Sequence, residues 1–208
     1  ATAGAGMAAA APWASAAVGA APVAKGDRIR LGVIGTGDRG RALIQNIAKT
    51  RNCTVAAICD NFELHLAKGR KLVDASTRAF TDHRAMRVPG GLDAVVIATP
   101  LDLHKRHSFD AFDAGIHVWC EKAMARTIDD CGAMVKKSQD SGKVLQIGHQ
   151  RMFKPTYLNA VRRAKEGEIG AITQIRASWH RQSSWRRPVR AGGSDRPINS
   201  RLYRDSLA

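Results

Sequence analysis

The sequence predicts an α/β protein, with a doubly wound parallel sheet first and the start of a second, α+β domain after it. Short, nearly continuous apolar runs recur between residues 28 and 150, as expected for parallel strands that are buried on both faces. Segments with apolar side chains at helical spacing lie between these runs. The first run leads directly into a glycine-rich loop. Together these observations predict βαβ units whose crossovers share one hand.

The first half of this domain is predicted to contain three strands and two helices. Residues 29–34 form a continuous apolar strand that ends in glycines. Residues 41–49 follow with Leu43, Ile44 and Ile47 on one face of a helix. The next predicted elements are a strand at 54–59, an amphipathic helix at 63–73 and a short, edge-like strand at 77–81.

The second half repeats the alternation. Residues 92–99 (LDAVVIAT) are predicted to be a buried strand, and residues 103–114 the next helix. Gly115 marks the turn before a strand at 117–120. A helix at 128–139 and a strand at 144–147 complete the unit. Residues 28–150 therefore read as one nucleotide-binding domain of ordinary size.

The N-terminal end differs from the rest of the chain. Its first 24 residues contain no charged side chain, and 13 of them are alanine. Small residues with A-x-A sites such as Ala14-Ser15-Ala16, before a charged start at Lys25, are typical of the end of an export signal. We therefore expect residues 1–27 to be a signal remnant, with a flexible leader as the alternative. The weak hydrophobicity suits the twin-arginine route and a periplasmic location, and interrupting Gly and Pro residues argue against a membrane span.

The C-terminal region carries much of the positive charge. The chain has a net charge of +15, and residues 151–208 contain 13 basic and 4 acidic side chains. Arginines interleaved with tryptophans could bind nucleic acid, but the favoured interpretation is an incomplete substrate-binding domain. It begins with a linking helix at 155–166 and a first strand at 171–180, followed by an arginine-rich loop. One strand cannot bury a sheet face, so 151–208 is predicted to be part of a larger domain.

The four cysteines, Cys53, Cys59, Cys120 and Cys131, show no C-x-x-C pair and no clustering with histidine. Their placement in or beside apolar strands predicts free, mostly buried thiols. Neither a disulfide nor a metal site is expected.

A phosphate-binding motif follows the first strand. Gly35-Thr36-Gly37-Asp38-Arg39-Gly40 is a G-x-G-x-x-G sequence at the start of a helix, the context that a dinucleotide site requires. The glycines allow a tight turn, close approach of a pyrophosphate and close helix packing, and the helix N-terminus supplies amide donors. Asp60, 20 residues after Gly40, can accept hydrogen bonds from both ribose hydroxyls. It would repel a 2′-phosphate, which favours NAD, with NADP as the alternative because of Arg39. These features identify the predicted sheet as Rossmann-type.

Two further segments follow strand ends, where ligands bind in open α/β sheets. They are Thr99-Pro100-Leu101-Asp102-Leu103-His104 and Cys120-Glu121-Lys122-Ala123. Together with GTGDRG, ICD and GHQRMFKP, they resemble the Gfo/Idh/MocA oxidoreductases, over residues 28–203. The chain departs from that family at Ala123, where relatives have a proline preceded by a cis peptide. Because such a bond is costly before other residues, Lys122 is expected to be held less rigidly than in relatives.

The resemblance implies roles for individual residues. The pyrophosphate would be framed by Gly35, Thr36, Gly37 and Arg39. Gly40 would allow the helix to pack close to the strand. Asp60 would hold the adenosine ribose. The cofactor path would be lined by Thr99, Pro100 and His104, with Glu121, Lys122 and Gln150 near the nicotinamide. Lys122 is the predicted catalytic residue, donating to a substrate hydroxyl as hydride leaves the same carbon. No role is expected for His65, His83 and His107, which are placed on predicted surfaces.

The leading hypothesis is an exported NAD(P)-dependent oxidoreductase acting on a sugar, cyclitol or related polyol, truncated here at both ends. The resemblance also implies an alternative of a different reaction class, because some members of that family are NAD-dependent glycosidases that use transient oxidation and elimination. A second alternative is a non-catalytic, basic nucleotide- or nucleic-acid-binding module. Under the leading hypothesis the partner is a small carbohydrate-like molecule, with no nucleic acid and no membrane, and the complete protein is a homo-oligomer.

Overall fold

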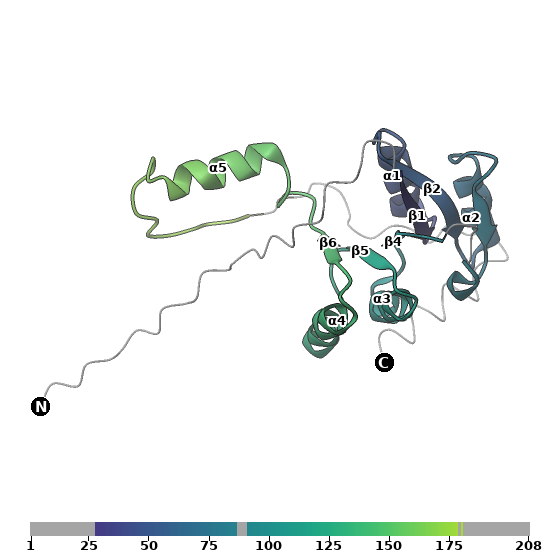
Figure 1. Ribbon diagram of the computed structural model, residues 1–208. Coiled ribbons are helices and arrows are strands. Elements are labelled where there is room, and N and C mark those ends of the chain that lie inside the picture. The colour runs from purple at the N-terminus through teal and green to yellow at the C-terminus, as the bar shows by residue number, and fades with distance from the viewer. Residues whose placement is uncertain (1–27, 87–90, 179, 181–208) are drawn as a thin grey trace, which may run out of the picture.

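The computed structural model describes residues 28–86, 91–178 and 180. One sheet of six parallel strands forms its centre, in the order β3-β2-β1-β4-β5-β6 (Figure 1). The strands are β1 Ile29–Ile34, β2 Cys53–Cys59, β3 Arg78–Phe80, β4 Ala94–Ile97, β5 His117–Glu121 and β6 Leu145–Gly148. This order reverses direction between β1 and β4, which makes their carboxyl ends the switch point of a doubly wound fold. The predicted fold class is confirmed for this domain.

Helices follow most strands. They are α1 Asp38–Ile47, α2 Glu63–Arg70, α3 His104–Asp113, α4 Ile128–Ser141 and α5 Pro155–Lys165, with short 3₁₀ helices η1 His83–Ala85 and η2 Leu101–Leu103. Gly37 precedes α1 without a side-chain cap, whereas the Thr127 hydroxyl caps α4 by accepting from Asp130 N. Gly142, in a left-handed conformation, ends α4.

Two cores bury the two faces of the sheet. Neighbouring residues of one strand belong to different cores, as the two-residue period of a strand requires. Thus Val33 packs with Ile44 of α1, while Ile34 belongs to the core that contains Phe112 of α3 and Met134 of α4. Because both faces are covered, most strand residues are apolar; the polar residues Arg30 and Arg78 are half-buried and exposed, respectively.

Two cysteines belong to the second core. Cys59 and Cys120 are buried, and burial raises the pKa of each thiol to about 12. Cys53 and Cys131 are half-buried, and all four thiols are free. The predicted free thiols are therefore confirmed.

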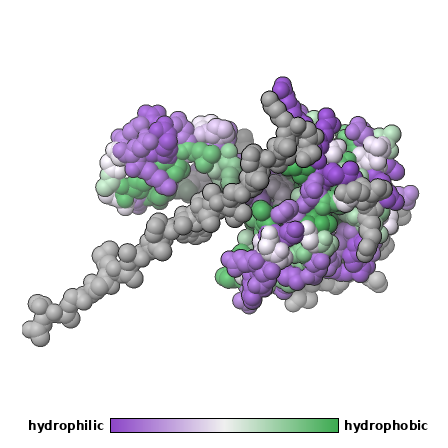
Figure 2. All heavy atoms as spheres, viewed as in Figure 1, coloured by the Kyte–Doolittle hydropathy of each residue, from purple (hydrophilic) through white to green (hydrophobic). Residues whose placement is uncertain are grey.

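The segment after the sheet differs from the rest. Helix α5 lies apart from the sheet (Figure 1), and its apolar side chains Tyr157, Leu158 and Val161 are exposed, which gives the hydrophobic area on that helix in Figure 2. The linking helix lies where it is predicted.

The strand predicted at 171–180 is wrong: residues 171–178 form no strand. A strand exists only through ladder hydrogen bonds to a neighbour, and no described segment pairs with this one. The predicted leader and the arginine-rich loop after residue 180 lie outside the described residues. Across the described part of the chain, no helix is long and apolar enough to cross a membrane.

Candidate cofactor-binding site

The glycine-rich loop joins β1 to α1 at the switch point. Gly35 has φ +91°, and a Cβ there would lie 2.7 Å from the Ala98 carbonyl oxygen. A Cβ on Gly40 would overlap the carbonyl oxygen of Gly35. At Gly37, by contrast, the nearest heavy atoms to such a Cβ are those of the His65 ring, at 3.7 Å. Two glycines are therefore required by packing, whereas a Cβ at Gly37 would make only ordinary van der Waals contact with the His65 ring.

Asp60 follows β2 and holds this loop. Its Oδ2 accepts hydrogen bonds from Thr36 N at 2.7 Å and from Thr36 Oγ1 at 3.2 Å, and its Oδ1 accepts from Phe62 N at 2.9 Å. The side chain is 9% exposed, and His65 Nδ1 lies 3.7 Å from Oδ2. A carboxylate has about four acceptor positions, so Asp60 retains acceptor capacity while it fixes the loop.

Arg39 and Glu121 connect α1 to the end of β5. Arg39 Nε lies 2.5 Å from Glu121 Oε1, and the Glu121 side chain is only 8% exposed. The other carboxylate oxygen of Glu121 accepts from the backbone N–H of Lys122 at 3.1 Å. Arg39 thus points toward β5, whereas Asp60 follows β2 on the opposite side of β1.

Lys122 is exposed directly after β5, at the carboxyl edge of the sheet that also carries the glycine-rich loop. The peptide between Lys122 and Ala123 is cis. At position 123 the chain therefore differs from the family in having alanine in place of proline. The preceding peptide bond has the cis form that is expected of relatives.

The turn after β4 contains the remaining residues of the predicted cofactor path. Pro100 is exposed and Thr99 is half-buried. His104 is only 1% exposed, with Nδ1 2.9 Å from the Ala123 carbonyl oxygen and Nε2 3.0 Å from the Thr99 carbonyl oxygen. Its ring lies beneath the turns and does not face an open surface. Gln150 is exposed after β6.

Two histidines that were expected on the surface lie inside. His107 is 7% exposed, with Nδ1 3.1 Å from Thr99 Oγ1, and it makes an edge contact with the His83 ring. His83 Nε2 lies 2.6 Å from Asp110 Oδ2. Burial, followed by the nearby His83, lowers the pKa of His107 to about 4. The expectation that His83 and His107 lie on the surface is wrong, because η1 folds back onto α3.

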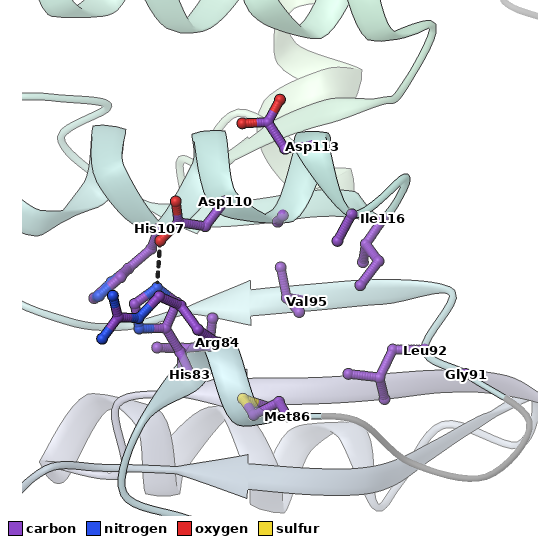
Figure 3. Close-up of a pocket in the computed structure, with 13 residues that line it drawn as sticks. His83, Arg84, Met86, Gly91, Leu92, Val95, His107, Asp110, Asp113 and Ile116 are labelled. Carbon is purple, nitrogen blue, oxygen red and sulfur yellow. Dashed lines mark hydrogen bonds and ion pairs between the residues drawn. The ribbon is translucent and has the colours of Figure 1, made fainter.

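These histidines line one end of a cavity of about 690 Å³ between α3 and β4 (Figure 3). Met86, Leu92, Val95 and Ile116 supply apolar walls. None of the predicted cofactor residues lines this cavity.

His65, for which no role is expected from the sequence, lies beside the predicted cofactor residues. It lies near Gly37 and near the Asp60 carboxylate, with a side chain that is 37% exposed. Its position five residues after Asp60, on the first turn of the next helix, is the signal that could have identified it.

The arrangement fits a dinucleotide. The absence of a side chain at Gly37 and the uncapped start of α1 suit a pyrophosphate, and the remaining acceptor position of the Asp60 carboxylate suits a hydroxyl of an adenosine ribose. Thr99 and Pro100 would border the path from there to the Lys122 turn. No group of three or more His, Cys, Asp or Glu side chains within the described ranges could hold a metal ion.

Comparison with known proteins gives an independent result. The model of an oxidoreductase family with an NAD-binding Rossmann fold, Gfo/Idh/MocA, matches residues 29–149. A glycosyl hydrolase family 109 protein of Solibacter usitatus is 31% identical over 183 residues, covering 76% of this chain and 41% of that protein.

Two solved structures are also similar. Scyllo-inositol dehydrogenase from Lactobacillus casei, with bound NAD(H) and scyllo-inositol, has a TM-score of 0.64 and 27% identity, covering 71% of this chain and 44% of that one. The WlbA dehydrogenase from Bordetella pertussis, in complex with NADH and UDP-GlcNAcA, has a TM-score of 0.63 and 29% identity, covering 69% and 43%.

The chain spans less than half the length of the curated relatives that it matches, from 37% to 47%. The family match covers most of the sheet-forming region, in which the glycine-rich loop, Asp60 and the Lys122 turn meet at one edge. The chain belongs to the Gfo/Idh/MocA oxidoreductases, with their NAD-binding Rossmann fold.

Proposed function

We propose that the complete protein is an NAD-dependent oxidoreductase acting on a sugar, cyclitol or related polyol. The observation that carries this proposal is the position of Lys122. Its side chain is exposed at the same edge of the sheet as the glycine-rich loop, and the Arg39–Glu121 ion pair connects its turn to the first turn of α1. The bound cofactors and ligands of the two similar structures, NAD(H) with scyllo-inositol and NADH with UDP-GlcNAcA, support this choice.

In the proposed reaction, a substrate hydroxyl lies against the Lys122 ammonium, which donates a hydrogen bond to its oxygen. This contact lowers the cost of deprotonation as the C–O bond becomes a carbonyl. When bound, the nicotinamide would accept the hydride from the same carbon. The proton of the hydroxyl passes to solvent. The residues of this chain therefore supply binding, orientation and charge.

An NAD-dependent glycosidase is the second candidate. It is favoured by the several relatives named as glycosyl hydrolase family 109 proteins. In that reaction, oxidation would acidify a neighbouring C–H, and loss of that proton would expel the aglycone and leave a double bond. Water would then add across this bond at the carbon that lost the aglycone, and the hydride would return to the carbonyl carbon. Lys122 and the cofactor site at the glycine-rich loop would serve both reactions.

The test uses the complete protein with NAD, a panel of polyols and sugars, and a panel of nitrophenyl glycosides. Formation of NADH in proportion to the oxidised polyol supports the dehydrogenase. Release of nitrophenol without net NADH supports the glycosidase instead. Salt-sensitive binding to nucleic acid together with indifference to NAD would support the basic binding module and refute both. A Lys122→Ala variant serves as the control in each assay.

We also propose that the protein is exported to the periplasm through a signal that ends within residues 1–27, and that the complete protein is a homo-oligomer. The alanine-rich, uncharged composition of that region supports export. Fractionation of the native host, with mass spectrometry of the mature N-terminus, tests the first proposal. Light scattering of the purified protein tests the second.

A further inference from the structure

His104 joins two turns that no strand pairing connects. The pairing of β4 with β5 ends at Ile97 and Cys120. His104, the first residue of α3, reaches past that point to the Thr99 carbonyl oxygen at 3.0 Å and the Ala123 carbonyl oxygen at 2.9 Å. It therefore extends the connection between the strands into the region where Lys122 lies.

Both partners of His104 are carbonyl oxygens, which only accept hydrogen bonds, so the ring acts here as a donor, and the tautomer decides which carbonyl receives the N–H of a neutral ring. The ring is 1% exposed, so water does not replace this donor. A buried carbonyl without its donor is costly, which makes the histidine specific at this position.

Lys122 is held from both directions as a result. On its N-terminal side, the buried Glu121 carboxylate accepts from the Lys122 backbone N–H at 3.1 Å and pairs with Arg39. On its C-terminal side, His104 holds the Ala123 carbonyl. The side chain of Lys122 is exposed, whereas the backbone that carries it is anchored to the domain.

We propose that His104 is a positioning residue, which acts through the Ala123 carbonyl to set the placement of Lys122. It does not contact cofactor or substrate, because its ring is buried and both nitrogens are engaged. This inference rests on the proposed function only in the part played by Lys122; the connection between the turns is independent of it.

The first experiment measures amide hydrogen exchange in the complete protein, for the segment from Glu121 to Ala125. His104→Gln keeps donors on a single nitrogen, whereas the His104 ring presents a separate nitrogen to each carbonyl, and His104→Leu removes every donor. His107→Gln is the matched control, since it alters another buried histidine of α3 that contacts Thr99 but not Ala123. We expect exchange to rise about tenfold in His104→Gln and not in His107→Gln. Unchanged exchange, or an equal rise in both variants, would overturn the proposal. If His104→Leu does not fold, His104→Gln decides.

The second experiment is a double-mutant cycle on turnover. His104→Gln should lower kcat about tenfold with the KM for NAD within about twofold, and should have no further effect in the Lys122→Ala background. A further tenfold loss in that background would show that His104 acts independently of Lys122 and refute the positioning role. If the wild-type protein oxidises no polyol and cleaves no glycoside, the proposed function fails, and hydrogen exchange decides the role of His104 alone.

Discussion

Replacing Asp60 with alanine separates two tasks of one carboxylate. Within the protein, Asp60 accepts three hydrogen bonds, from Thr36 N, Thr36 Oγ1 and Phe62 N. A hydrogen bond contributes about 0.5–1.5 kcal/mol net, and more to a charged group. Asp60→Ala should therefore lower the free energy of unfolding by about 2–4 kcal/mol. Urea denaturation measures this change.

The effect on cofactor binding should depend on the cofactor. About one acceptor position of Asp60 remains for the ribose; losing a hydrogen bond from a ribose hydroxyl to this charged group costs about 3 kcal/mol, which raises the Kd for NAD roughly 100-fold. NADP carries a phosphate in place of one hydroxyl, and the variant also relieves its repulsion by the carboxylate. The Kd for NADP should therefore change by less than about fivefold, and the preference for NAD should fall by at least about tenfold.

Calorimetric titration of both cofactors against the complete protein tests this prediction. Thr36→Val is the matched control, because it removes the Thr36 hydroxyl that contacts Asp60 and leaves the carboxylate in place. It should weaken both cofactors slightly and equally. An equal loss of NAD and NADP affinity in Asp60→Ala would refute the assignment of Asp60 to the ribose and leave it as a residue that only fixes the loop.

The other predictions concern catalysis, stability and pH. Lys122→Ala should lower kcat by about 10²–10⁴-fold while the Kd for NAD, measured by titration, stays within a few fold; unchanged turnover would exclude Lys122 from the mechanism. Arg39→Met deprives the buried Glu121 of its cationic partner and should lower the free energy of unfolding by about 1–3 kcal/mol. Adding Glu121→Gln should restore most of that loss in urea denaturation, and a lack of recovery would contradict the pairing. The pKa of His107 is lowered to about 4 in the folded state, so the unfolded chain binds a proton first as pH falls below about 6.5. The free energy of unfolding should therefore fall by up to about 1.4 kcal/mol per pH unit between pH about 6.5 and 4. Thermal unfolding of His107→Gln should show a smaller fall with pH than the wild type, and an equal fall in both would contradict the prediction.

The alternation of strands and helices could be predicted because both faces of the sheet are covered and the strand residues are therefore mostly apolar. Element boundaries were harder. Helix α1 begins at Asp38, three residues before the predicted start, since Gly40 in its first turn looks like part of a loop. Strand β4 is shorter than predicted at both ends, although the backbone N–H groups of Asp93 and Ala98 still donate to carbonyl oxygens of β1.

The site could be predicted where one motif carries the chemistry and not where two distant residues do. The geometry of the Gly35–Gly40 loop follows from its own sequence. The pairing of Arg39 with Glu121 joins positions that are 82 residues apart, and no pattern in the sequence around either residue indicates it. The burial of His107 likewise depends on η1, whose three-residue length leaves no periodicity to detect.

The raised pKa values of the Cys59 and Cys120 thiols lower the chemical reactivity of both groups in the folded protein. Only the thiolate attacks disulfides and oxidants, and at pH 7 roughly one in 10⁵ of these groups is ionised. Mixed-disulfide formation with glutathione and alkylation therefore proceed slowly at both positions while the domain stays folded. Labelling of either cysteine by an alkylating reagent then reports how often the sheet opens.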